Sequence, residues 1–212
     1  MPSVKVQLST SANVFDLSST EPFIITLHVL LHHDSPITFP ITASKLTDGT
    51  MFRQGGLTFR DIHTGEFAKR NTINVCHDNS PIILCPENEE IFLTLYPKQK
   101  HTTEEMFTRG EALVFADDAP NEANGEIESK RPVVWKWFHT RGLHDGTTYE
   151  VGLDEGLCIK PWFRGSKEEL LRKPLSERHE SAMSRDVVAV QAVQTASFRV
   201  RRPDTDGALD WP

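Results

Sequence analysis

The chain has 212 residues and a formal net charge of −7 at pH 7, from 23 basic and 30 acidic side chains. This length suits a single domain, and 38% hydrophobic residues are enough for a core, which excludes wholesale disorder. The acidic balance argues against a nucleic-acid partner or an anionic membrane surface, because proteins that bind either usually carry an excess of Lys and Arg.

The cysteines and the first residues bear on the compartment. Three cysteines, Cys76, Cys85 and Cys158, cannot form a fully paired disulfide framework. The segment 1–6 lacks the basic and apolar regions of a signal peptide, and no apolar run approaches the ~20 residues that a membrane span needs. We therefore expect a cytoplasmic protein with reduced thiols and no membrane partner.

Short β-strands are predicted along the first third of the chain. Apolar and polar residues alternate over 4–8, which indicates a half-buried strand. The segment 23–31 is apolar on one face and partly apolar on the other, as in a central strand. Pro40 predicts that the strand around it is an edge strand, because proline cannot donate to a neighbour. A strand at 57–62 followed by Gly65 predicts a hairpin.

The middle of the chain combines strands with a long polar segment. We expect two strands, 73–76 and 82–85, joined by a turn, and a further strand at 90–96 that stops before a proline. The segment 105–115 reads as a strand with a leading helical turn. The segment 116–132 is rich in Asp, Glu, Asn and Pro and predicts a solvated loop.

One helix is expected in the last third, among further strands. Ser166 and Glu169 form a capping box, which predicts a short helix near residues 166–173. The segment 203–212 is expected to be a flexible tail. Further strands are predicted at 133–138, 147–153, 157–159, 187–193 and 197–201.

The predicted elements together indicate the fold class. Roughly eight to ten short strands, separated by turns and accompanied by one helix, are typical of an all-β, antiparallel β-sandwich. We expect a single sandwich domain over 1–202 with the solvated loop at 116–132. A barrel with a lumen is the alternative.

Four segments also resemble a known group of proteins. They are the opening Val-Gln-Leu-Ser-Thr, then Phe59-Arg60-Asp61, the stretch 142–151, and Trp-Phe-Arg-Gly-Ser at 162–166. Together they resemble uncharacterised fungal β-sandwich proteins of about this length. The Leu-x-x-Gly-x-x-Tyr pattern that begins at Leu143 is similar to the penultimate strand of many immunoglobulin-like modules. The resemblance implies an immunoglobulin-like sandwich and brings no catalytic residues.

The nine histidines do not form a metal-binding pattern. His28 and His32 share a strand face but stand four residues apart, about 13 Å, which is too far for one ion. Strand alternation sends Cys76 and His77 to opposite faces, although a site that also includes Cys85 is conceivable. We predict no metal site.

Motifs for nucleotides and covalent catalysis are also missing. The sequence has no Walker A, no Gly-x-Gly-x-x-Gly and no Gly-x-Ser-x-Gly elbow. We therefore expect no cofactor.

One acid–base pair stands out at a strand end. Asp61 and His63 are two residues apart on one face, so the carboxylate could orient the imidazole or raise its pKa. Arg60 on the opposite face could bind an anion or brace a loop. The alternative for all three residues is a solvated rim.

The densest aromatic cluster lies after the polar loop. Trp135 and Trp137 share one strand face, and Phe138 and His139 follow. The two indole rings either fill the core or line a ligand-binding concavity. Trp162 adds a ring beside the predicted helix, where it could cover the end of the sandwich.

These observations leave several functions open, and whether the protein is an enzyme stays undecided. The first is a β-sandwich that binds a small apolar molecule or a protein partner. The second is a cofactor-independent isomerase or cyclase of fungal secondary metabolism, with an aromatic-lined pocket. The third is a structural or assembly module, and a homodimer is one form that it could take. The residues predicted to bind a ligand are Trp135, Trp137, His139, His63 and Asp61.

Overall fold

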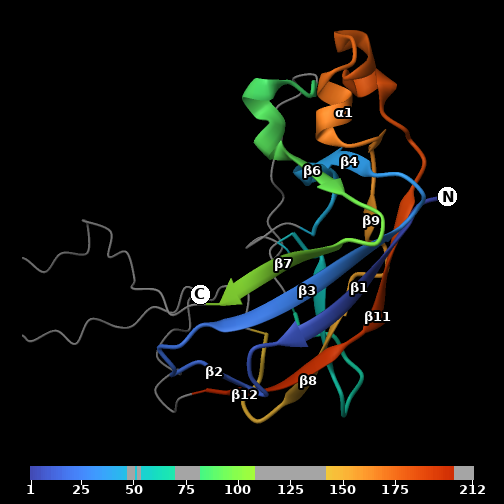
Figure 1. The fold of residues 1–212 in the computed structure, drawn as a ribbon. Helices are drawn as coiled ribbons and strands as arrows, with labels where there is room; N and C mark the ends of the chain where they lie inside the picture. The colour runs from blue at the N-terminus through green and yellow to red at the C-terminus, as the bar shows by residue number, and fades with distance from the viewer. Residues whose placement is uncertain (47–50, 52–53, 70–81, 108–141, 203–212) are drawn as a thin grey trace, which may run out of the picture.

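The structure is a computed structural model that describes residues 1–46, 51, 54–69, 82–107 and 142–202. The predicted loop at 116–132 and the tail at 203–212 therefore lie outside the described residues, and so do the strands expected at 73–76 and 133–138. Strands are the predominant regular structure of the described chain, which confirms an all-β protein (Figure 1).

Within the described residues, twelve strands form three sheets. The five-stranded sheet has the order β7 (Lys100–Phe107), β3 (Phe23–His32), β1 (Ser3–Thr10), β11 (Val188–Gln194) and β9 (Cys158–Ile159). The four-stranded sheet has the order β2 (Val14–Asp16), β12 (Ala196–Arg201), β8 (Thr148–Leu153) and β5 (Leu57–Asp61). The three-stranded sheet has the order β10 (Phe163–Arg164), β4 (Ile37–Pro40) and β6 (Phe92–Leu95).

The expectation of purely antiparallel pairing is wrong at two places. β1 pairs with β11 in parallel, and β2 pairs with β12 in parallel, so the two larger sheets are mixed. Both pairs join the start of the chain to its last strands. β1 continues into β2, and β11 continues into β12. Each pair of consecutive strands passes from the five-stranded sheet to the four-stranded sheet, so the two pairs run side by side in the same direction. Parallel pairing follows from that arrangement.

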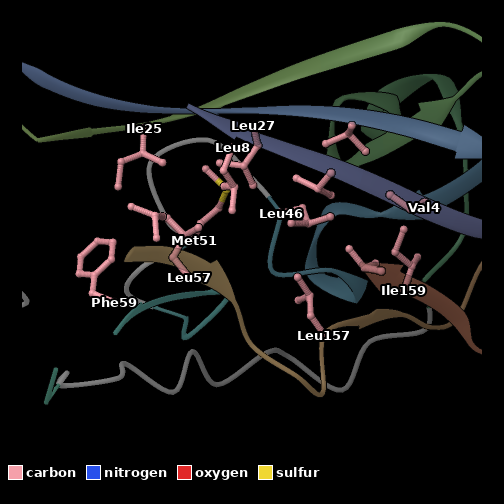
Figure 2. Close-up of a cluster of buried hydrophobic side chains, with 14 of the residues drawn as sticks. Val4, Leu8, Ile25, Leu27, Leu46, Met51, Leu57, Phe59, Leu157 and Ile159 are labelled. Carbon is pink, nitrogen blue, oxygen red and sulfur yellow. The ribbon is translucent and has the colours of Figure 1, made fainter. Parts of the chain in front are cut away.

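The core lies between the five-stranded and four-stranded sheets. Along β3 every second residue is buried, and the intervening residues up to Leu30 are only partly exposed, as predicted for a central strand; His32 at the end of the strand is exposed. Figure 2 shows Leu8, Ile25 and Leu27 pointing toward Leu57 and Phe59 across the interior. Leu46 and Met51 enter this interior from the segment before β5 and fill the space between the sheets.

Several short elements lie at one end of the five-stranded sheet, at the top of Figure 1. This cap consists of the three-stranded sheet, helix α1 (Lys167–Leu171) and the 3-10 turns η2 (Pro86–Ile91), η4 (Leu175–Glu177) and η5 (Glu180–Ala182). A fourth 3-10 turn, η1 (Ile41–Ala43), follows β4. The cap has its own small core, made by Leu84, Phe92, Phe163, Leu170 and Met183.

Helix α1 confirms the predicted capping box. The Ser166 hydroxyl accepts a hydrogen bond from the Glu169 backbone N–H at 3.2 Å, and the Glu169 carboxylate accepts one from the Ser166 N–H at 2.9 Å. A five-residue helix leaves most of its backbone groups without helical partners, so these two bonds and the burial of Leu170 define its start.

Replacing Ser166 by alanine is expected to lower the free energy of unfolding by about 1 kcal/mol, because the first-turn N–H loses its acceptor in a buried setting. Urea unfolding followed by circular dichroism measures the change. Ser176→Ala in η4 is the control, since the structure shows no side-chain hydrogen bond there. Equal stability of both variants would contradict the cap's role.

Two strand expectations need correction. β4 is the middle strand of its sheet although it contains Pro40. Pro40 is its last residue and lies opposite Phe92 of β6, whereas β10 pairs only with Ile37 and Thr38, so the missing N–H falls where β10 has ended. The segment 82–85 is not a strand. Ile83 forms a single bridge, and Cys85 precedes the turn η2, whose proline favours a helical start.

Candidate functional site

The aromatic cluster predicted to bind a ligand cannot be located. Trp135, Trp137 and His139 lie outside the described residues, so the pocket expected there stays a prediction. Cys76 also lies outside them, while Cys85 and Cys158 are free thiols. Within the described part of the chain, no group of three His, Cys, Asp or Glu side chains is close enough to hold a metal ion.

Asp61 is the last residue of β5, and His63 lies in the hairpin turn that follows. The Asp61 carboxylate accepts hydrogen bonds from the backbone N–H of His63 at 2.8 Å and of Thr64 at 3.4 Å. These bonds, that of His63 first, hold the pKa of Asp61 below its usual value. Gly65 completes the turn with a positive φ of 76°, as its sequence position predicted. The described role of Asp61 is therefore to stabilise the turn, and ligand binding by the pair stays a prediction.

Arg60 braces two strands. Its guanidinium donates a hydrogen bond to the Glu150 carboxylate of β8 at 2.7 Å, and Thr195 donates another at 3.0 Å. The Arg60 bond is the main cause that keeps the pKa of Glu150 below its usual value. The Arg60 guanidinium already pairs with the Glu150 carboxylate, so Arg60 is a poor candidate for binding an anionic ligand.

A hollow of about 430 Å³ lies where the cap meets β1 and the end of β3. Figure 1 places the N-terminus at this end of the molecule, below the cap. We call it the Trp162 hollow, and its lining includes Pro2, His33, Trp162, Arg164, Met183 and Asp186. Aromatic, apolar and oppositely charged groups meet here, which is the composition expected of a small-molecule site.

Trp162 forms a fixed floor of this hollow. Its backbone pairs with Ser184 through two hydrogen bonds, of 3.3 Å and 2.7 Å. Its indole N–H donates to the Asp186 carbonyl at 2.9 Å, and the side chain is 4% exposed. A ring held in this way does not have to be ordered when a ligand arrives, which favours binding.

His33 stands beside Trp162 with its ring edge-on, at 6.3 Å between centroids. Its Nδ1 lies 2.9 Å from the Ser35 carbonyl, a contact that requires a proton on Nδ1. The Ser35 backbone N–H would need a lone pair on the same nitrogen, but it is farther away, at 3.4 Å. The shorter contact assigns the proton to Nδ1 and leaves the lone pair of the neutral ring on Nε2.

Arg164 and Asp186 supply the charges of the hollow. In β10, strand alternation buries Phe163 in the cap and leaves Arg164 exposed on the face of Trp162. Asp186 follows Ser184, whose hydroxyl accepts the Asp186 N–H at 3.2 Å. Within the described residues, neither the guanidinium nor this carboxylate has a hydrogen-bond or ion-pair partner.

Sequence reasoning found only part of this site. It placed Trp162 at the end of the sandwich but missed His33, Arg164 and Asp186. The alternation Trp-Phe-Arg was a usable signal for Arg164, because residues two apart share a strand face. No comparable signal exists for His33 and Asp186, which tertiary folding brings to Trp162 from distant positions.

A second hollow, of about 420 Å³, lies beside β5 and β8. It is lined by Phe67, Ala68 and Leu153 and by the acidic residues Asp154 and Glu155, among others. None of its described lining residues is a cation or a histidine. It therefore offers fewer kinds of interaction than the Trp162 hollow.

No described helix has the length and apolar character needed to cross a bilayer. Comparison of the chain with protein-family models finds no match, and comparison with curated proteins and with solved structures finds none either.

Proposed function

We propose that the protein is a binding module that holds a small molecule with an apolar body in the Trp162 hollow. The observation that carries this proposal is a hollow of about 430 Å³ whose lining includes the edge of a Trp162 ring held in place by a hydrogen bond. Sites for small molecules commonly have volumes of about 300–1,000 Å³ and combine apolar walls with a few polar groups.

The proton on His33 Nδ1 argues against one catalytic role, the activation of the Ser35 hydroxyl. The Ser35 hydroxyl lies 3.1 Å from His33 Nδ1, the arrangement in which an imidazole could activate a nucleophile. The stronger contact to the Ser35 carbonyl keeps a proton on that nitrogen, so it cannot accept one from the hydroxyl. The isomerase alternative stays a prediction that depends on Trp135, Trp137 and His139. An immunoglobulin-like arrangement of the two larger sheets likewise stays a proposal.

The test uses the dye anilinonaphthalene sulfonate, whose fluorescence rises in apolar surroundings. The wild-type protein is expected to bind it, and Ala182→Phe is expected to weaken binding about tenfold, because the added ring occupies the hollow. Ala182 is exposed, so the substitution leaves the core intact.

Ala189→Phe is the matched control, on an exposed position of β11 that does not line the hollow. It is expected to bind the dye as the wild type does. Absence of dye binding by the wild type, or equal binding by both variants, would refute the proposal.

A further inference from the structure

We propose that the Trp162 hollow takes a short peptide of two or three residues with free termini, a zwitterion with an apolar side chain. This inference rests on the proposed function and adds the chemical class of its ligand. It follows from where the two unpaired charges stand relative to the indole.

The bridge between Trp162 and Ser184 sets the positions of both charges. The two segments run antiparallel at this bridge. Arg164 lies two residues beyond Trp162, and Asp186 lies two residues beyond Ser184 in the opposite direction. Arg164 and Asp186 therefore lie beyond opposite ends of the bridge, and their Cα atoms stand up to about 13 Å apart.

This separation explains why the charges are unpaired. No ion pair of 4.0 Å or less joins Arg164 to Asp186 among the described residues, although both line one hollow. Both side chains are exposed and fully able to engage a ligand, because no internal bond has to be broken first. A ligand that carries both charges at a distance satisfies the two groups together.

The chemistry of each end identifies the ligand's groups. A guanidinium matches a carboxylate with two parallel hydrogen bonds, and an Asp carboxylate accepts hydrogen bonds from an ammonium group. The apolar lining of the hollow includes Ala182, which is exposed, and the outer edges of Trp162 and Met183, which are otherwise buried at 4% and 5% exposure. They offer an apolar surface to the central part of the ligand.

Length and volume select a short peptide within this class. A free α-amino acid carries its ammonium and carboxylate groups on one carbon, so it reaches both charges only if the Arg164 and Asp186 side chains bend toward each other. An extended peptide spans about 3.3–3.6 Å per residue, so three residues cover about 10 Å. The side chains of Arg164 and Asp186 cover the rest of the distance. A hollow of about 430 Å³ leaves no space for a much longer chain.

The test compares the tripeptide Ala-Leu-Ala with its N-acetylated, C-amidated form by isothermal titration calorimetry. Both peptides carry the same apolar side chain, and only the first carries the terminal charges. The free peptide is expected to bind at least about tenfold more tightly, with an advantage that shrinks at high salt. Equal binding of the two forms would overturn the inference.

Two substitutions test which residue binds each terminus of the peptide. Arg164→Met is expected to weaken binding of the free peptide about tenfold and to leave binding of the C-amidated peptide unchanged. Asp186→Asn is expected to act in the same way on the ammonium end, with the N-acetylated peptide unchanged. Arg185→Met is the control, because Arg185 pairs with Glu180 and does not line the hollow. Equal losses for charged and blocked peptides would contradict the assignment.

The dye separates the two proposals. If Ala182→Phe blocks the dye but the free and blocked peptides bind alike, the hollow is a site and its ligand is not a zwitterion. If the free peptide binds Ala182→Phe as it binds the wild type, the peptide site lies elsewhere and the inference fails.

Discussion

Replacing Phe198 by alanine is expected to lower the free energy of unfolding by about 3–5 kcal/mol, a large part of the stability of a typical domain. Phe198 of β12 is 1% exposed and lies at the centre of an aromatic cluster. Its ring centroid is 5.1 Å from that of Phe23 in β3 and 5.2 Å from that of Phe59 in β5. The substitution opens a cavity between the two larger sheets, where rigid rings on both sides limit collapse.

Phe67→Ala is the matched control for this prediction. Phe67 is 60% exposed, so the same chemical change removes little buried surface and is expected to alter stability by about 0.5 kcal/mol or less. Urea unfolding followed by circular dichroism compares the two variants. A loss below about 1 kcal/mol for Phe198→Ala would show that the core between the sheets does not depend on this ring.

The second large effect is expected at Glu105, a carboxylate inside the molecule. Glu105 is 5% exposed on β7, and its Oε2 accepts a hydrogen bond from the backbone N–H of Met51 at 3.0 Å. Met51 is fully buried between the sheets (Figure 2). Replacing Glu105 by leucine, which has a similar volume, leaves that N–H buried without this acceptor. We expect a loss of about 1–3 kcal/mol in the free energy of unfolding.

A competing effect acts on the same variant. Removing a buried carboxylate also removes its desolvation penalty, which on its own would stabilise the protein. We expect the loss to prevail because the donor stays behind, whereas stabilisation requires that both partners become apolar. Glu21→Leu, at an exposed position, is the control in the same unfolding measurement. A gain in stability for Glu105→Leu would show that desolvation dominates.

Local patterns predicted individual elements well. The alternation over 23–31 predicted a central strand, and β3 is one, because the side-chain period of a strand is set by neighbouring residues alone. The Ser166–Glu169 box predicted α1 for the same reason, since a cap forms within four residues. The local sequence is sufficient to specify elements of this kind, and tertiary packing did not change them.

Local patterns did not predict which strands pair with each other. Pro40 indicated an edge strand, yet β4 is central, because what matters is how far β10 extends along it. The parallel pairing of β1 with β11 joins residues from the two ends of the described chain, and no local signal encodes it. Strand order depends on which arrangement fills the core, a property of the whole fold.

By itself, the sequence determined the all-β class, the short capped helix and the burial pattern of single strands, since each depends on residues a few positions apart. Only the tertiary structure decided the mixed sheets and the Trp162 hollow. His33, Trp162 and Asp186 meet there because a backbone bridge and an indole hydrogen bond tie separate segments together. A site assembled from such segments depends on long-range packing. The side-chain periodicity of a single strand does not predict such a site.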